Sequence, residues 1–270
     1  MNLLIGPKTK FINVVSCYWN QENALEKQFQ PFLKRSTPFL NLSECEKLLA
    51  LTYLNESQPF GKVDAFSTVG MVSTSESYNE LFIQKIESAT QIVCKVCELK
   101  LLLDSSVKFF VPLIGVSSKD ELRSGGSGKS AHWLKGAIFL SLPTTPKNSI
   151  LELALNIVHE LGHQILMVYQ DADQILINPN EEIYSSVRKT KRPAIMSFHA
   201  LIAVYFMLFF LKNLSVADED QRDFINERQK ILYSDFVGGA FALKDASFTP
   251  VGLALFHEML SNIEVFKKVS

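Results

Sequence analysis

The pattern of apolar and polar positions changes near residue 105. Residues 1–104 have apolar positions that recur mostly at helical spacing. Beyond them, “SVKFFVPLIGV” and “KGAIFLSLP” are short runs rich in strand-forming residues, and the polar, glycine-rich segment “SSKDELRSGGSGKSAHW” separates them. We therefore predict two strands and a connecting loop, which form a small antiparallel element.

Helices are predicted to make up most of the remaining chain. An apolar, proline-free run from Ser149 to about Tyr169 is followed, after a polar segment, by a second apolar helix at 194–212. The charged region “ADEDQRDFINERQKILYSDF” predicts an exposed helix, and the last helix begins with Thr249 as its N-cap and Pro250 in its first turn. The expected fold is α+β and mainly helical, with a helical N-terminal part, a small antiparallel β element and a metal-binding helical core.

The second apolar helix could be either a membrane span or a buried core helix. Residues 194–211 carry no formal charge, and 18 such residues are just enough to span a bilayer. A helix that is apolar all round lies either in lipid or in a large core. Because a histidine lies within the span and the flanks are not clearly asymmetric in charge, we expect a buried helix and no membrane partner.

The composition indicates which partners and which cellular compartment to expect. The 270 residues include 27 basic and 28 acidic side chains, and this balance gives no reason to expect a nucleic acid partner. We expect no signal peptide, because the N-terminal segment lacks a charged start followed by a long apolar run. Four cysteines are too few for a disulfide scaffold, and Cys94 and Cys97 lack the second pair that a zinc ribbon needs. We therefore expect a cytoplasmic protein.

The segment “NIVHELGHQIL” contains the main candidate for chemistry. His159 and His163 are four residues apart, so on a helix they share one face and two imidazoles can bind one metal ion. Glu160 lies beside the first of them. Burying two histidines and a glutamate in so apolar a helix without partners would be costly. A metal site is therefore the favoured interpretation.

A third ligand must come from elsewhere in the chain. The metzincin pattern fails, because Leu166 and Tyr169 stand where it requires glycine and histidine. Glu181 and Glu182 lie at a plausible distance for a peptidase with a glutamate ligand, although in a loop-like segment. The remaining candidate is His199, at the start of the second apolar helix.

A basic segment, “YSSVRKTKRP”, precedes His199. Arg188, Lys189, Lys191 and Arg192 place four cations within five residues. Arginine can grip a carboxylate through two parallel hydrogen bonds. In a peptidase such an arginine would hold a substrate terminus, and in an oxygenase it would hold the distal carboxylate of α-ketoglutarate.

Taken in order, these features resemble the HExxH-type, α-ketoglutarate-dependent peptide β-hydroxylases, also described as HExxH-motif peptide-modification proteins. The resemblance covers roughly residues 105–262 and is carried by “LRSGGSGKSAHWLKGAIFLSLP”, “LALNIVHELGHQIL”, “YSSVRKTKRPAIMSFHALIAVYFML” and “FTPVGLALFHEML”. Many peptidases share the HExxH alone, so the arginine, Arg-Pro and histidine segment is the discriminating part. “KTK” stands where the family commonly has a bulkier residue and a dipeptide such as Asp-Pro, so Arg188 and Arg192 are both candidates for the co-substrate.

The resemblance implies a non-haem iron enzyme. Fe(II) would be held by His159, His163 and His199, with α-ketoglutarate and O₂ at the three open positions. Glu160 would orient a ligand or a water molecule. The substrate would be an amino acid, hydroxylated at its β-carbon, in a peptide or on a carrier protein. Residues 105–270 would be the catalytic region, and residues 1–104 would contribute to substrate selection.

Two other classes of function stay open on the sequence alone. A zinc metallopeptidase would use the same two histidines and a third ligand, with Glu160 as general base. A catalytically inactive helical binding protein would retain the motif without the reaction.

The other chemical motifs are weaker. “GSGKS” lacks the earlier glycine of a phosphate-binding P-loop, because Arg123 stands in its place, and no buried strand precedes it. Its glycines permit a loop that covers a site. His132, in the same loop, is a candidate for the substrate entrance, whereas His257 is expected to pack or face solvent.

Overall fold

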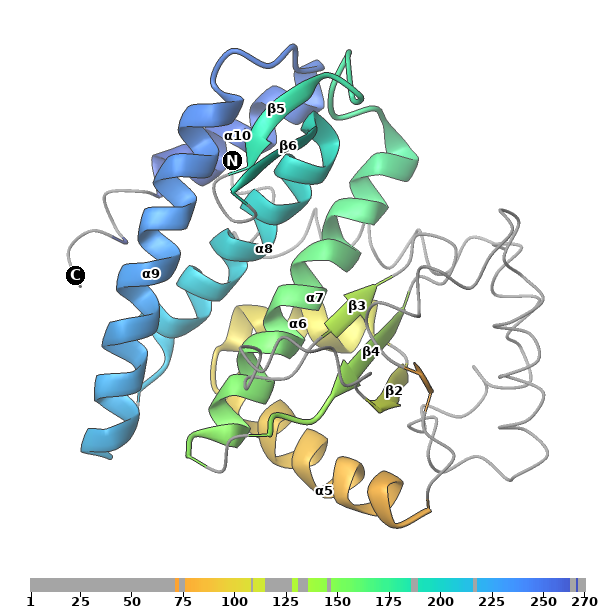
Figure 1. Cartoon of the computed structure of the whole chain (residues 1–270), viewed down its shortest axis with the longest axis vertical. Helices are drawn as coiled ribbons and strands as arrows, with labels where there is room; N and C mark the ends of the chain where they lie inside the picture. The colour runs from red at the N-terminus through yellow and green to blue at the C-terminus, as the bar shows by residue number, and fades with distance from the viewer. Residues whose placement is uncertain are drawn as a thin grey trace.

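Helix α7 (Ser149–Ala172) lies at the centre of the fold and contacts neighbours on several sides (Figure 1). It contains no proline, and apolar side chains on opposite faces, such as Leu153 and Leu155, are buried. Such burial on both sides of a helix requires layers of structure around it. The predicted helix from Ser149 to about Tyr169 is confirmed, and it carries the HExxH segment.

The structure is a computed structural model. It describes residues 71–72, 76–107, 109–114, 128–130, 136–144, 147–185, 189–215, 218–262 and 266. The predictions that lie outside the described residues concern Cys17, Cys45, His132, Arg188 and the helices expected before residue 71.

Helix α8 (Ala194–Asn213) packs along α7 on one side and along α9 (Glu219–Leu243) on the other (Figure 1). α8 is apolar all round, and these two neighbouring helices cover much of its surface. In its most apolar stretch of 18 residues, 67% is buried. Its length and hydropathy would allow a membrane span, but this burial is what a core helix shows. The expectation of a buried helix at 194–212 is therefore met.

Helices α7 and α8 come very close at Gly162. A Cβ atom at this position would lie 3.1 Å from Cα of Ala203 and 3.4 Å from the carbonyl oxygen of Ile202. Because Gly162 has no side chain, the two backbones can approach each other here. The contact lies directly before His163 on α7 and one turn after His199 on α8. The crossing point of these helices therefore sets the spacing of the predicted ligands.

A four-stranded sheet lies against the opposite flank of α7, in the order β1-β2-β4-β3 (Figure 1). Its strands are β1 (Met71–Val72), β2 (Phe109–Ile114), β3 (Gly128–Ser130) and β4 (Ala137–Ser141). β2 and β4 are the two predicted strands, but they pair in parallel, so the predicted antiparallel pairing was wrong for them. The reason is β3, which forms within the predicted loop and pairs antiparallel with β4, while the long connection across residues 115–136 permits the parallel arrangement.

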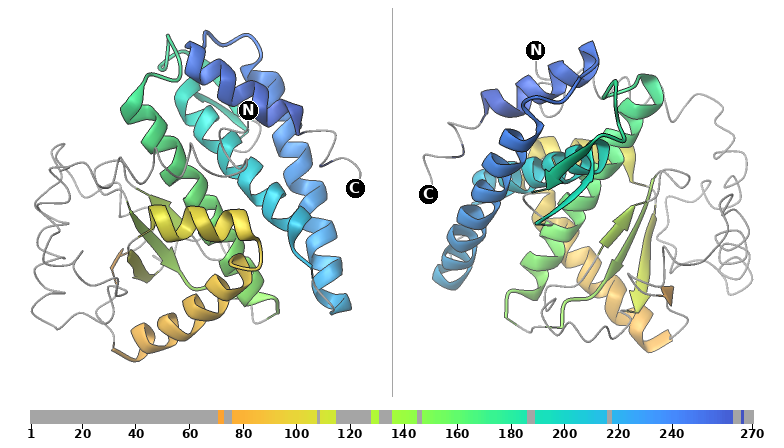
Figure 2. Two further views of the ribbon diagram at one scale, coloured as in Figure 1. Left: turned by 180° about the vertical axis from the view of Figure 1, so that it is seen from behind. Right: turned by 45° about the horizontal axis from the view of Figure 1, so that its top comes forward.

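Helices α5 (Glu76–Val93) and α6 (Cys97–Ser106) complete the cover of α7 (Figure 2). Seen from behind, α6 crosses in front of α7. Both contribute to the same hydrophobic core as α7 and α8, through Phe82 and Leu99 among others. Cys94 and Cys97 are free cysteines, and neither belongs to a disulfide in the described residues.

A short hairpin precedes α8, and a last helix follows α9. The hairpin, β5 (Glu182–Ser185) and β6 (Thr190–Pro193), is antiparallel and lies within a segment expected only to be polar. Helix α10 (Pro250–Ser261) begins as predicted: the Thr249 hydroxyl accepts a hydrogen bond from the amide of Gly252 at 3.1 Å. The fold is α+β and mainly helical, as expected.

Replacing Gly162 with valine should separate α7 from α8. The branched side chain would be forced against the backbone of α8, and overpacking of this kind costs about 1–3 kcal/mol. We expect urea denaturation to show this loss in the free energy of unfolding. Ser234→Val, at an exposed position of α9, controls for the helix propensity of valine and should cost less than about 0.5 kcal/mol. Equal losses in the two variants would contradict the close crossing.

Candidate metal centre

Two ring nitrogens from α7 converge on one point. His159 and His163 are one helical turn apart, and their Nε2 atoms lie 3.0 Å from each other. The rings are nearly perpendicular, with centroids 4.7 Å apart and an interplanar angle of 88°. The side chain of His159 is 36% exposed, so an ion or substrate can reach it. Neutral imidazoles in this arrangement can bind one metal ion, which typically lies about 2.1 Å from each nitrogen.

Glu160 lies next to this pair but is buried. Its Oε1 atom is 3.9 Å from Nε2 of His159, and the exposed fraction of the residue is only 2%. Its Oε2 atom has no hydrogen-bond partner among the described residues. Burial raises the pKa of this carboxyl to about 8, and Ser130 and Lys129 offset the rise in part. Near neutral pH the group can therefore both hold and release a proton.

The burial of Glu160 depends on strand β3. A Cβ atom at Gly128 would lie 2.6 Å from Oε1 of Glu160, so the carboxyl occupies the space that a side chain would fill. Ser130 donates a hydrogen bond of 3.4 Å to the Glu160 main-chain carbonyl. Burial lowers the pKa of the Lys129 ammonium, and the neighbouring Glu160 counteracts this in part. The strand therefore both encloses the carboxyl and brings a cation near it.

These residues fit a metal ion. His159, Glu160 and His163 each offer a ligand atom, and these atoms all lie within 4.8 Å of one another. An orphaned carboxylate oxygen beside two convergent nitrogens is a donor set that an ion would satisfy. Imidazole and carboxylate suit Fe(II) and Zn²⁺ alike, so the donor types do not choose between the two metals.

His199 adjoins this group from α8. Its Nδ1 atom is 3.4 Å from Nδ1 of His163, and the two ring centroids are 5.4 Å apart. Its Nε2 atom lies 3.0 Å from Oε1 of Gln170 on α7. His163 therefore faces His159 with one nitrogen and His199 with the other. The structure brings the three predicted histidines into contact, although His199 is not within the tighter group formed by His159, Glu160 and His163.

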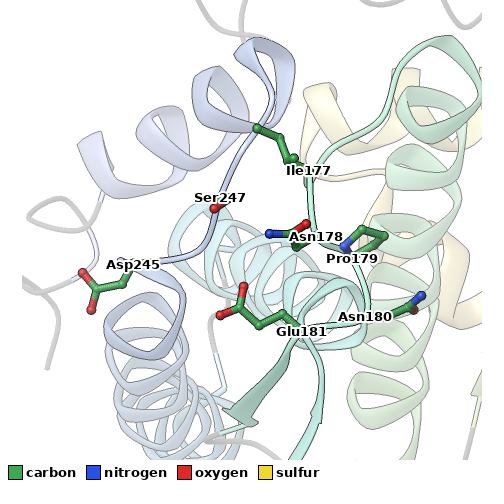
Figure 3. Close-up of a pocket in the computed structure, with 7 residues that line it drawn as sticks. All are labelled: Ile177, Asn178, Pro179, Asn180, Glu181, Asp245 and Ser247. Atoms are coloured by element: carbon green, nitrogen blue, oxygen red, sulfur yellow. The ribbon is translucent and has the colours of Figure 1, made fainter.

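The alternative third ligands lie elsewhere. Glu181 and Glu182 are exposed at the start of the β5–β6 hairpin, and neither belongs to the metal-binding group found in the described residues. Glu181 instead lines a separate open pocket of about 510 Å³, together with Asn178, Asp245 and Ser247 (Figure 3). His257 is exposed on α10, as expected.

The basic side chains before α8 differ in their exposure to solvent. Lys189 is exposed and its ammonium lies 3.6 Å from a carboxylate oxygen of Asp235 on α9. Lys191 is exposed, whereas Arg192 is half-buried on β6, opposite Ile183 of β5. Of the two arginines predicted to bind the co-substrate, Arg192 is half-buried, and Arg188 lies outside the described residues.

Sequence reasoning missed three residues of this centre: Gly128, Lys129 and Gln170. The first two belong to the “GSGKS” segment, which the sequence predicts as a loop that covers a site and not as a source of residues for the centre. Gly128 carried no distinct signal, because it stands among other glycines in a segment predicted to be a loop. Gln170 carried no such signal, because its role depends on where α8 crosses α7.

The chain matches no protein-family model, and no curated protein matches it at a significant level.

The buried carboxyl predicts how the stability of the metal-free protein depends on pH. The folded-state pKa of Glu160, about 8, lies above the usual value of 4.5, so the native state holds a proton that the unfolded chain releases between these values. The free energy of unfolding should therefore fall as pH rises from 5 to 8 and level off above 8. Glu160→Gln should remove this contribution, which amounts to at most about 4 kcal/mol.

Urea denaturation from pH 5 to 9 in the presence of a chelator measures this effect as the difference between wild type and variant. Glu181→Gln, at an exposed carboxyl, is the matched control and should follow the wild-type profile. A difference between wild type and Glu160→Gln that does not change with pH would show that the carboxyl is not buried in this way.

Proposed function

We propose that this protein is a non-haem Fe(II)- and α-ketoglutarate-dependent oxygenase. It would hydroxylate the β-carbon of an amino acid in a peptide or on a carrier protein. The observation that supports this best is the contact between His163 on α7 and His199 on α8, because it adds a third imidazole to the pair from the HExxH segment. Three imidazoles bound to one Fe(II) would leave three positions for co-substrate and O₂, once Nδ1 of His199 moves from Nδ1 of His163 to the side of the Nε2 pair.

His199 is a better third ligand than Glu160 on physical grounds. Glu160 is enclosed by β3 and holds a proton up to about pH 8, so it must lose that proton before it can bind a metal ion. An imidazole binds as a neutral group and pays no such cost. We therefore assign His159, His163 and His199 to the metal and keep Glu160 as a residue that orients a ligand or a water molecule.

When bound, iron and α-ketoglutarate supply the oxidising chemistry: one atom of O₂ becomes the new hydroxyl group, the other enters succinate, and CO₂ is released. The chain has to bind and orient the reactants and exclude water. Arg192 is half-buried just before α8, and its guanidinium suits the distal carboxylate of the co-substrate. Lys189 is less suited, since it is exposed and lies beside Asp235.

The sheet supports a peptide substrate. β3 forms the edge of the four-stranded sheet among the described residues, and Glu160 packs directly against it. Edge strands bind extended peptides through main-chain hydrogen bonds. A peptide paired with β3 would therefore lie close to the candidate metal ligands on α7.

A zinc metallopeptidase is the second candidate, and one observation favours it. The pKa of Glu160 is raised to about 8, and its carboxyl lies 3.9 Å from His159. The ionised fraction of a group with this pKa is a stronger base than an ordinary carboxylate and can take a proton from a water molecule, as the general base of a peptidase must. Its third ligand would also be His199, since Glu181 and Glu182 are outside the group.

Reconstitution with iron tests the oxygenase proposal. Metal-free protein that receives Fe(II) and α-ketoglutarate without oxygen should develop a weak visible charge-transfer band, because the co-substrate would chelate the metal. Admission of O₂ should then convert α-ketoglutarate to succinate and bleach the band. His199→Ala should abolish iron binding, whereas the exposed-position variant His257→Ala should leave the band unchanged.

Glu160→Gln separates the two candidate reactions. In an oxygenase the variant keeps the iron band, since Glu160 is not a ligand. In a zinc peptidase it lowers the rate of peptide cleavage by about 10²–10⁴-fold, because the general base is lost. The absence of a band, together with zinc-dependent cleavage that this variant abolishes, would overturn the oxygenase proposal in favour of the peptidase.

Arginine variants test how the co-substrate is held. Arg192→Ala should raise the KM for α-ketoglutarate by about 10-fold or more, since a charge-assisted pair contributes about 1.5–3 kcal/mol. Arg192→Lys should recover part of this loss, and Lys191→Ala, at an exposed position on the same strand, should have no effect. If only Arg188→Ala raises the KM, that residue holds the carboxylate. If neither change does, the carboxylate is bound elsewhere.

A further inference from the structure

Gln170 contacts the histidine that α8 contributes to the centre. It lies on the same face of α7 as the HExxH histidines, because seven residues after His163 amount to about two turns. Its Oε1 atom is 3.0 Å from Nε2 of His199, while Nδ1 of that histidine points to His163 at 3.4 Å. The imidazole of His199 is therefore held between two partners from α7.

The chemistry of these partners selects one form of the ring. A neutral imidazole carries a proton on one nitrogen and a lone pair on the other. The carbonyl oxygen of Gln170 can only accept a hydrogen bond, so Nε2 of His199 must donate it. The lone pair then resides on Nδ1, the atom that faces Nδ1 of His163.

We propose that Gln170 is a positioning residue that holds His199 with its proton on Nε2 and thereby keeps Nδ1, which faces His163, as the basic nitrogen of the ring. In metal sites the second ring nitrogen of a histidine ligand usually donates a hydrogen bond that fixes its tautomer and orientation. Gln170 supplies that acceptor here. It also ties the tip of His199 back to α7, so that the ring cannot turn towards solvent without losing the bond.

This inference rests on the proposed function only for its effect on metal binding. The tautomer itself is a property of the metal-free protein. Its measurement therefore succeeds or fails whether or not the protein binds iron and α-ketoglutarate.

Long-range ¹H–¹⁵N NMR of histidine-labelled, metal-free protein reads the tautomer directly, at a pH where the ring is neutral. The signals of His199 are identified by their loss in His199→Gln. We expect Nε2 to be protonated and Nδ1 to be unprotonated in the wild type. Gln170→Leu should give a mixture of the two forms. A proton on Nδ1 in the wild type, or an unchanged tautomer in Gln170→Leu, would overturn the proposal.

Gln170→Glu makes the test independent of any loss of folding in the leucine variant. A carboxylate can accept the same hydrogen bond but cannot donate one. It should therefore preserve the proton on Nε2. If the amide of Gln170 instead donated to His199, the glutamate variant would reverse the tautomer, and the assignment would be wrong.

Metal affinity provides the second readout. Competition with a chromophoric chelator, using Co²⁺ or Fe(II) alone as the probe, should show about 10–100-fold weaker binding in Gln170→Leu. Gln170→Glu should bind nearly as tightly as the wild type. Gln174→Leu, at an exposed position two residues after the end of this helix, is the control and should be unchanged. Equal affinities in all four proteins would show that Gln170 does not position a ligand.

Discussion

The close contact between α7 and α8 at Gly162 sets the distance between the histidines that the two helices carry. A side chain at this position would meet the backbone of Ala203 and Ile202, so glycine allows the helices to approach where larger residues would hold them apart. His163 follows this glycine directly on α7, and His199 precedes Ala203 by one turn on α8. The distance between the two imidazoles is therefore set by backbone packing. Rigid helices position a site more precisely than loops do, because their side chains are fixed by the surrounding core.

The same helix has to satisfy two opposing demands. Most of α7 is buried in the hydrophobic core, yet it carries two histidines and a glutamate. The histidines avoid the cost of burial by facing a half-exposed region. Glu160 does not, and the rise of its pKa to about 8 measures how strongly its surroundings oppose the charge. Strand β3 contributes to this by closing over the carboxyl at Gly128. Strongly perturbed carboxyls cluster at functional sites, and this one adjoins the candidate metal centre.

The sequence predicted the parts of this centre that follow from local pattern. The helix around His159 and His163 follows from apolar spacing, and the buried helix with His199 follows from its uniform hydrophobicity. The parallel pairing of β2 with β4 could not be predicted in the same way, because β3 is a three-residue strand within a glycine-rich segment and has little periodicity to detect. Gln170 and Lys129 were beyond reach for a related reason. Their importance comes from contacts with residues 29 and 31 positions away in the chain, and no local pattern encodes such distances.

The two proposed reactions, oxidation and hydrolysis, place different demands on the charge of Glu160. If Glu160 keeps its proton near neutral pH, it is a poor base and a poor ligand, and the centre presents imidazoles alone. If a bound metal ion drew the proton off, the same carboxyl would become a base beside the ion, and hydrolysis would be favoured. The enclosure of Glu160 by β3, with Lys129 only partly offsetting its burial, favours the first state. The position of β3 therefore affects the protonation of Glu160, although no residue of that strand is a candidate metal ligand.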